Sequence, residues 1–308
     1  KEEVQAIEEG YLQPAATLLL HRPAGANWQM WHNSGLAALG IALENDSIVN
    51  VAINKDKYGY HYLIEKHKNN DGWINEGSPH YHYYPLEALL FTANAVKCRG
   101  IKLFDKDLHD MFVEPVKGTY PDLSFPAHSD GWYGANLLSQ SALYEVANAR
   151  YNDPFLKRVL ELTYAQKKRL DPEALLSNQL IKASGESLLQ QSYSFDTSGF
   201  CLLRSDARTV VLKFGGEGIG HGHPDKLSIT IHDGKNELVS DFGTSGYGVP
   251  DYLKWYKRTL SHNTVTVDAK DQKRSVGKLL KFNPLSDGGY AEAETTTAYP
   301  GVRMKRSL

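Results

Sequence analysis

The sequence predicts an α+β protein in which stacked helical hairpins are followed by an antiparallel β-sandwich. In the first half, apolar residues recur at three- and four-residue spacings, as on one face of a helix. From about Tyr193 the pattern changes to short alternating or β-branched runs bounded by turn residues, which is typical of antiparallel strands. We therefore expect a helical portion at 1–175 and a sandwich portion at 190–308, with the boundary between Leu170 and Tyr193.

Five helices are expected in the first portion, and loops between them are short. Their ranges are 28–43, 47–68, 86–96, 136–149 and 154–168. Pro85 bounds the third helix upstream and Gly100 bounds it downstream. Short loops between helices of this length make the neighbours antiparallel, so helical hairpins stack on one another. The polar segment between Leu170 and Tyr193 has room for one more short helix.

Five strands are expected in the second portion. Their ranges are 199–204, 209–214, 227–232, 237–240 and 263–267. Asp233-Gly234 predicts a hairpin turn between the third and fourth of them. Strands that follow one another without intervening helices favour an antiparallel sandwich.

Composition excludes several classes of function. With 308 residues, 41% apolar and 23% charged, the profile is that of an ordinary globular chain. A formal net charge of −2 gives no basic field for nucleic acid, and no apolar run approaches the roughly 20 residues of a membrane span. Cys98 and Cys201 fit neither a disulfide framework nor a cysteine zinc site. The chain starts at Lys1 without a signal peptide, so we expect a processed or partial chain. Oligomeric state is not indicated.

Histidines and an aspartate gather in the second portion. The stretch 218–226 contains His221-Gly222-His223, and Asp241 and His262 follow within 42 residues of the first histidine. Imidazole and carboxylate groups are standard zinc ligands, and a His-x-His pair can begin a site that later strands complete. For a lone His-Gly-His, unrelated loop histidines are an equal alternative. Asp241 and His262 favour a metal site.

The stretch 75–84 is dense in polar aromatic side chains and ends in an unbroken run of phenols and imidazoles. Each buried hydroxyl or imidazole needs a hydrogen-bond partner, so a core rarely holds so many. For Tyr83 and Tyr84 we favour packing against neighbouring helices. For Tyr81 we favour a functional role.

Five segments in order now resemble one family: Asn27-Trp28, 76–82, 221–226, 241–244 and 262–265. Together they are similar to the heparinase II/III family of polysaccharide lyases, which includes heparinases and exolytic alginate or oligoalginate lyases. The resemblance implies an incomplete α/α toroid followed by an antiparallel β-sandwich, and a periplasmic or secreted location. The helical part is short for the family, which implies a fragment without some N-terminal helices.

The resemblance implies β-elimination in an acidic glycan that contains uronic acid, of the alginate or heparin/heparan type. Such a lyase removes the C5 proton beside a carboxylate and expels the sugar linked through O4. Something must hydrogen-bond or neutralise the carboxylate, because its charge opposes the developing carbanion. A base must take the proton, and an acid must protonate the leaving oxygen.

Residue roles follow from the resemblance. It implies that Tyr81 is the catalytic tyrosine, Asn27 the carboxylate-binding residue and His221 the catalytic histidine. It further implies that His223, Asp241 and His262 bind one structural zinc ion per chain. Only one member of the His221-x-His223 pair then binds metal. We expect the site where the helical and sandwich halves meet.

This sequence departs from the family pattern at two places, and each departure adds candidate catalytic residues. Some relatives have histidine after the carboxylate-binding asparagine, where this chain has Trp28. His32, about one helical turn beyond, can take part of that role because positions four apart share a helix face. Equally, it can pack among Trp28 and Trp31.

The second departure concerns the acid. Relatives that act on alginate use a further tyrosine from the sandwich half, and Tyr247 is the candidate because its glycine-rich loop follows Asp241. Tyr252 and Tyr256 are competitors.

Two other functions stay open. One is a zinc-dependent hydrolase, although no glutamate lies beside His221 or His223 in a metalloprotease pattern. The other is a non-catalytic glycan-binding protein. Products distinguish them, because a lyase creates a conjugated double bond that absorbs ultraviolet light.

Overall fold

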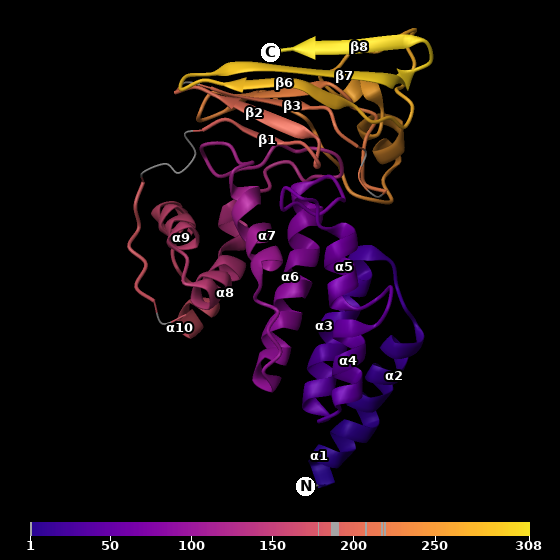
Figure 1. Cartoon of the computed structure of the whole chain (residues 1–308), viewed down its shortest axis with the longest axis vertical. Helices are drawn as coiled ribbons and strands as arrows, with labels where there is room; N and C mark the ends of the chain where they lie inside the picture. Colours follow the sequence, from indigo (N-terminus) through magenta and orange to yellow (C-terminus); the bar gives the residue numbers. More distant parts are fainter. Residues whose placement is uncertain (1, 178, 186–190, 207, 217, 219) are drawn as a thin grey trace. The chain divides into compact units, whose positions relative to one another are not determined.

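A computed structural model describes residues 2–177, 179–185, 191–206, 208–216, 218 and 220–308 (Figure 1). The chain forms two compact units. The first contains the chain up to Lys68 together with Tyr83–Met111, and the second contains Asn69–His82 and Phe112–Leu308. Within the described residues, no helix is long and apolar enough to cross a bilayer.

The first unit is helical. Its elements are α1 (Glu2–Ile7), η1 (Glu8–Leu12), α2 (Gln13–His21), α3 (Ala26–Ala42), α4 (Asp46–Asn54), α5 (Tyr60–His67), most of α6 (Pro79–Val96), η2 (Lys97–Arg99) and the start of α7 (Lys106–Val116). Helices α3 and α4 form a close hairpin. A Cβ built on Gly40 would lie 2.7 Å from Cγ2 of Val49, so a larger residue would force the two helices apart.

The predicted helix 47–68 is wrong as a single element, because the chain breaks it into α4 and α5. Asn45 caps α4 by accepting hydrogen bonds from the backbone N–H groups of Ser47 and Ile48. At the break, a Cβ on Gly59 would lie 2.6 Å from the backbone nitrogen of Lys55. Only glycine allows so tight a turn, which the apolar pattern of the two helices conceals.

The predicted start of α6 is also wrong, because Pro85 lies inside the helix and does not bound it. The helix begins at Pro79, and the Ser78 hydroxyl accepts a hydrogen bond of 3.3 Å from the backbone N–H of Tyr81. Serine at the cap followed by proline at the first helical position is a favoured start. Tyr81 therefore lies in the first turn of a helix.

The second unit contains helices and two antiparallel sheets. Its helical elements are the start of α6, the end of α7, η3 (Leu137–Gln140), α8 (Ser141–Tyr151), α9 (Pro154–Gln166), α10 (Glu173–Ser177), η4 (Tyr252–Tyr256) and η5 (Thr259–Ser261). Helices α8 and α9 confirm the last two predicted helices, and α10 lies where a further short helix was expected. The predictions missed α1, α2 and α7.

The five-stranded sheet has the order β1-β2-β3-β4-β5, and the three-stranded sheet has the order β6-β7-β8. The strands are β1 (Tyr193–Phe195), β2 (Phe200–Arg204), β3 (Thr209–Lys213), β4 (Ser228–His232), β5 (Glu237–Val239), β6 (Lys278–Pro284), β7 (Gly289–Tyr299) and β8 (Val302–Ser307). Neighbouring strands in both sheets pair antiparallel. Strands β2 to β5 confirm four predicted strands, and the turn at Asp233-Gly234 joins β4 to β5 as expected.

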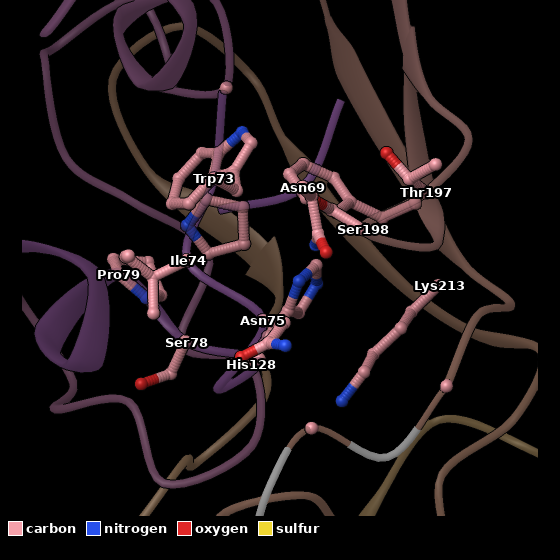
Figure 2. Close-up of a pocket in the computed structure, with 16 residues that line it drawn as sticks. Asn69, Trp73, Ile74, Asn75, Ser78, Pro79, His128, Thr197, Ser198 and Lys213 are labelled. Atoms are coloured by element: carbon pink, nitrogen blue, oxygen red, sulfur yellow. The ribbon is translucent and has the colours of Figure 1, made fainter. Parts of the chain in front are cut away.

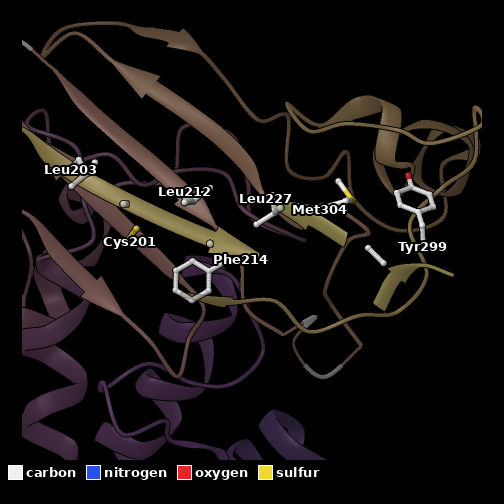
Figure 3. Close-up of a cluster of buried hydrophobic side chains, with 10 residues drawn as sticks. Cys201, Leu203, Leu212, Phe214, Leu227, Tyr299 and Met304 are labelled. Atoms are coloured by element: carbon white, nitrogen blue, oxygen red, sulfur yellow. The ribbon is translucent and has the colours of Figure 1, made fainter. Parts of the chain in front are cut away.

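One core joins the two sheets (Figure 3). Cys201 and Leu212 from the five-stranded sheet share it with Ala291, Ala293 and Met304 from the three-stranded sheet. Apolar side chains from both sheets thus meet between them, which is the packing of a β-sandwich. Helices followed by an antiparallel sandwich confirm the predicted order.

The predicted strand 263–267 is wrong. Polar side chains tie this segment to neighbouring loops: Asn263 donates to the carbonyl of Ser240, and Thr264 donates to the carbonyl of Lys226. Val267 makes only an isolated bridge with Lys270 in the described chain. Side-chain hydrogen bonds to backbone groups replace the ladder that its β-branched residues suggested.

The change from helix to strand falls between Ser177 and Tyr193, within the expected interval. The boundary between the two compact units differs from this change of secondary structure, because helices α8, α9 and α10 belong to the same unit as the sheets. The portions 1–175 and 190–308 therefore stay a prediction about domains.

Candidate active site

Tyr81, His221 and Tyr247, here called the phenol–imidazole cluster, lie together in the second unit. The hydroxyl oxygens of Tyr81 and Tyr247 are 2.5 Å apart. The ring of Tyr81 stacks on that of His221, with centroids 3.5 Å apart and an angle of 14°. The Tyr247 hydroxyl also lies 2.8 Å from Nδ1 of His221. Three side chains from distant parts of the chain thus present two phenols and one imidazole to one another.

The loop that carries Tyr247 is held close to a second loop at 128–131. Gly243 has a φ of +58°, and a Cβ there would lie 2.0 Å from the carbonyl oxygen of Gly131. The backbone N–H of Thr244 donates to the same carbonyl at 3.1 Å. No residue other than glycine fits at 243, so the glycine-rich sequence fixes where Tyr247 can stand.

Asp130 lies beside this cluster, and sequence reasoning missed it. Its Oδ2 is 3.1 Å from Nδ1 of His221 and accepts hydrogen bonds from the hydroxyls of Tyr247 at 3.0 Å and Tyr252 at 2.9 Å. Its Oδ1 is 2.9 Å from Nε2 of His223. The residue is 1% exposed. An acidic residue inside a loop rich in glycine and tryptophan is the only local signal, and many surface turns share it.

Charge and burial set the protonation of these groups. Burial alone would raise the pKa of Asp130, but hydrogen bonds from His221 and His223 hold that pKa well below its usual range. Burial, the hydrogen bond with Tyr81 and the negative charge of Asp130 raise the pKa of Tyr247 well above its ordinary value. Tyr247 therefore keeps its proton at neutral pH and is suited to donate it.

The competing phenols differ in their contacts. The Tyr252 hydroxyl bonds to Asp130, and burial together with that carboxylate raises the pKa of Tyr252 well above normal. Its ring lies edge-on to that of Tyr247, with centroids 5.1 Å apart. Tyr256 ends the short helix η4 that Tyr252 begins, and its carbonyl accepts a hydrogen bond from the Ser261 hydroxyl. The direct contact with Tyr81 favours Tyr247 among the three.

Two further ionisable residues border the cluster. Glu76 is 1% exposed, and its Oε2 lies 3.5 Å from Nε2 of His221. Lys257 Nζ lies 3.7 Å from Oδ2 of Asp130 and 5.2 Å from the centre of the Tyr252 ring. His221 is thus placed between two carboxylates, one at each ring nitrogen.

Asp225, Asp241 and His262, here called the buried His–Asp cluster, could hold a metal ion. One ligand atom from each lies within 4.8 Å of the others, and all three residues are buried. Nδ1 of His262 is 2.9 Å from Oδ2 of Asp241. Burial would raise the pKa of Asp241, but the neighbouring His262 lowers it. Asp225 was not among the predicted ligands.

His223, the remaining predicted ligand, lies next to this cluster. Its ring centroid is 5.2 Å from that of His262. Nδ1 of His223 and Nε2 of His262 are buried and have no hydrogen-bond partner within the described part of the chain. A buried nitrogen without a partner is unfavourable unless something binds it. Two such nitrogens beside two carboxylates form a donor set that fits zinc.

Two lysines already balance one carboxylate of the buried His–Asp cluster. Nζ of Lys213 is 2.5 Å from Oδ2 of Asp225, and Nζ of Lys226 is 3.2 Å from its Oδ1. Both lysines are buried. A fully paired Asp225 has less charge to offer a metal than Asp241, which favours the predicted set that contains His223.

Asn27 and His32 belong to α3 in the first unit. Asn27 is buried in the first turn, and Trp28 is 67% exposed. Nδ1 of His32 is buried without a hydrogen-bond partner among the described residues. The roles of Asn27 and His32, and a site where the halves meet, stay predictions.

The packing expected for Tyr83 and Tyr84 is found. Tyr83 is buried, and the Tyr84 ring lies 5.4 Å from that of Trp31. These neighbours of Tyr81 thus belong to the helical core.

A small cavity of about 170 Å³ lies in the second unit (Figure 2). Trp73, Ser78, His128 and Lys213 are among its lining residues, and Lys213 donates to the Ser129 hydroxyl at 2.6 Å. Burial and the charge of Lys213 lower the pKa of His128 to about 4. Ligand pockets usually measure about 300–1,000 Å³, so this cavity is too small for a glycan chain.

The family described as heparinase II/III-like, C-terminal, matches residues 188–308. In this C-terminal part the chain is similar to the heparinase II/III family. An alginate lyase of Stenotrophomonas maltophilia is 28% identical over 99% of this chain and 46% of its own length. An exo-oligoalginate lyase of Saccharophagus degradans is 26% identical over 100% and 47%. A heparin-sulfate lyase of Bacteroides stercoris is 27% identical over 78% and 35%.

Solved structures show the same fold. A heparinase III gene product has a TM-score of 0.76 at 19% identity, covering 97% of this chain and 46% of its own. A heparan sulfate lyase from Pedobacter heparinus has a TM-score of 0.73 at 19% identity, covering 95% and 45%. This likeness confirms the predicted fold class, an incomplete α/α toroid followed by an antiparallel β-sandwich. The chain spans about half the length of the curated alginate-lyase relatives.

Proposed function

We propose that the protein is a polysaccharide lyase that cleaves a uronic-acid-containing glycan by β-elimination. The observation that carries the proposal is the contact between the Tyr81 and Tyr247 hydroxyls, 2.5 Å apart beside the stacked ring of His221. β-Elimination needs one group to accept a proton and one to donate a proton. Two phenols in direct contact supply such a pair.

In the proposed reaction Tyr81 takes the C5 proton, the bond between C4 and the linking oxygen breaks, and a C4–C5 double bond forms. Tyr247 donates its proton to the departing oxygen. The raised pKa of Tyr247 supports this division, because the phenol stays protonated until a strongly basic oxygen develops beside it. His221, stacked on Tyr81 and placed between Glu76 and Asp130, holds the Tyr81 ring in position.

The uronate carboxylate needs a partner, and we assign this role to Asn27 with His32 as a second candidate. An amide donor aimed at the carboxylate stabilises the charge that spreads onto it when C5 loses its proton. The assignment of Asn27 is supported by its side-chain amide, which can donate hydrogen bonds to a carboxylate.

We further propose that His223, Asp241 and His262 hold one structural zinc ion per chain. The two buried nitrogens without partners support this ligand set. Such an ion, when bound, cross-links the loops that carry these residues. The chain's own residues then place His221, two positions from His223, against Tyr81.

For the substrate we propose alginate or its oligosaccharides ahead of heparin-type chains. The relatives that match 99% and 100% of the chain are named alginate lyase and exo-oligoalginate lyase, whereas the Bacteroides stercoris heparin-sulfate lyase matches 78%. Such polyanions lie outside the cytoplasm, so we also propose a periplasmic or secreted location.

The test is a screen of alginate, oligoalginate, heparin, heparan sulfate and hyaluronan for new ultraviolet absorbance. The proposal expects absorbance to rise with alginate or its oligosaccharides and to be lost in Tyr81→Phe. Tyr11→Phe serves as the matched control, because Tyr11 is 73% exposed in the first unit. Chain cleavage with added water and no absorbance would indicate a hydrolase, and binding without cleavage would indicate a glycan-binding protein.

A further inference from the structure

We propose that Asp130 is a positioning residue that couples the proposed metal site to the phenol–imidazole cluster through its two carboxylate oxygens. The two oxygens serve different partners. Oδ1 lies 2.9 Å from Nε2 of His223, and Oδ2 bonds to His221, Tyr247 and Tyr252. A single side chain thus contacts one predicted zinc ligand and two members of the phenol–imidazole cluster.

On the metal side, the contact selects a tautomer of His223. An ionised carboxylate only accepts hydrogen bonds, so Nε2 of His223 must carry the proton that Oδ1 accepts. The lone pair of the neutral ring then resides on Nδ1, which is buried and has no partner among the residues described. A carboxylate that accepts from one ring nitrogen so that the other can bind metal is a recurrent arrangement around metal-binding histidines.

On the catalytic side, the same carboxylate fixes the direction of the Tyr247 hydroxyl and the His221 ring. The backbone N–H of Asp130 also donates to the carbonyl of His221 at 3.0 Å, so main chain and side chain both hold this histidine. The loop of Asp130 is itself anchored, since Lys213 donates to Ser129 and Gly131 lies against Gly243. Rigid support of this kind is what a precise proton-transfer geometry requires.

Two acceptor oxygens are essential to this role. An asparagine of the same shape offers one acceptor, and its amide nitrogen would face an N–H or O–H donor on the other side. Asp130→Asn therefore cannot accept hydrogen bonds on both sides, from His223 on one and from His221 and Tyr247 on the other. A residue that only filled space would tolerate the change.

The inference rests on the proposed function for its catalytic half, whereas its metal half is tested without substrate. Zinc affinity is measured by chelator competition in wild type, Asp130→Asn and Tyr252→Phe, and the visible spectrum is recorded after cobalt substitution. We expect Asp130→Asn to bind zinc about 10–100-fold more weakly, as is usual when such a partner is lost, and to alter the cobalt spectrum. Tyr252→Phe removes one donor from Oδ2 only and should keep the wild-type zinc affinity.

Turnover supplies the second readout. Asp130→Asn should lower kcat more than KM, because the substrate-binding groups stay in place while the proton-transfer pair is misaligned. Unchanged zinc affinity and an unchanged cobalt spectrum in Asp130→Asn would overturn the proposal. If wild type forms no unsaturated product from any glycan, the proposed function fails while the metal result stands.

A measurement on the wild-type protein covers the case in which Asp130→Asn does not fold. Two-bond proton–nitrogen NMR correlations of the histidine rings report which nitrogen carries the proton. We expect His223 to be protonated at Nε2, with Nδ1 shifted on zinc binding. Protonation at Nδ1, or a shift at Nε2 on zinc binding, would refute the coupling.

Discussion

The phenol–imidazole cluster and the buried His–Asp cluster contain similar donor groups in opposite environments. Tyr247 is 54% exposed and the His221 side chain 21% exposed, whereas Asp225, Asp241 and His262 are all buried. An exposed set of proton donors and acceptors can meet a polymeric substrate. A buried set can exchange neither substrate nor product quickly, so it is suited to hold an ion that supports the fold. The difference supports the proposal that the first cluster carries the chemistry and the second holds a structural ion.

The largest expected effect is that of Tyr81→Phe. This change removes one hydroxyl and keeps the ring that stacks on His221, so the fold and the zinc content should be unchanged. Loss of the base should lower kcat by roughly 10²-fold or more. Rates come from the ultraviolet assay, and near-normal turnover would show that Tyr81 does not transfer the proton.

Tyr247→Phe should follow, with roughly a 10²-fold loss of kcat and little change in zinc content. Its loss should be smaller for substrates whose leaving group needs no proton, such as a uronic acid that carries an acidic phenol linked through O4. Tyr252→Phe is the comparison, since Tyr252 bonds to Asp130 from the same loop region. Equal losses on both kinds of substrate would argue against an acid role for Tyr247.

Asn27→Ala tests a residue of the first unit, whereas both clusters lie in the second unit. Loss of one donor that stabilises transition-state charge should cost about 10²-fold in kcat/KM. Zinc content should be unchanged, because Asn27 does not belong to the buried His–Asp cluster. The parallel variant His32→Ala separates the two candidates, and a larger loss there would move the carboxylate-binding role to His32.

His262→Ala probes the buried cluster and should act on stability first. Zinc should be lost, and Asp241 would be left buried without its imidazole partner. Breaking a buried pair costs about 3–5 kcal/mol, which corresponds to a fall in Tm of roughly 5–8 °C for a chain of this size. Metal analysis and thermal unfolding measure the two effects. Bound zinc at the wild-type level would exclude His262 as a ligand.

The smallest expected effect concerns Glu237, which lies outside both clusters. Burial raises the pKa of Glu237 from 4.5 to about 7. Because the folded state binds this proton more tightly, its contribution to stability is present below pH 4.5 and is lost as pH rises to about 7. Glu237→Gln should therefore gain about 1 kcal/mol relative to wild type between pH 4 and 8, a value reduced for partial exposure. Urea unfolding at both pH values tests it, and a constant difference would contradict the shift.

Sequence patterns predicted those features of the fold that depend on residues close together in the chain. Turn residues at Asp233-Gly234 and the change of period near Tyr193 were sufficient for the order of helices and strands. The break at Gly59 and the helix start at Ser78-Pro79 were missed, because apolar spacing continues through both. Strand 263–267 failed because Asn263 and Thr264 bond to loops that no local pattern reveals.

Some residues of the candidate site could likewise be predicted from local sequence motifs, whereas others depend on contacts between distant parts of the chain. Tyr81, His221 and Tyr247 are predicted from distinctive motifs, and the structure places the three side chains next to one another. Asp130 was missed because its importance comes from contacts with residues 91–122 positions away. Asp225 was quoted in a motif, yet only the packing of buried side chains shows that it lies beside Asp241 and His262.

His221→Ala tests the central claim most directly, because His221 lies two residues from His223 and adjoins both environments. One preparation is assayed for zinc and for unsaturated product from alginate oligosaccharides. The account predicts a full complement of zinc together with a loss of turnover of roughly 10²-fold. Loss of zinc from this variant, or turnover that stays at the wild-type level, would contradict the separation of an exposed catalytic cluster from a buried metal site.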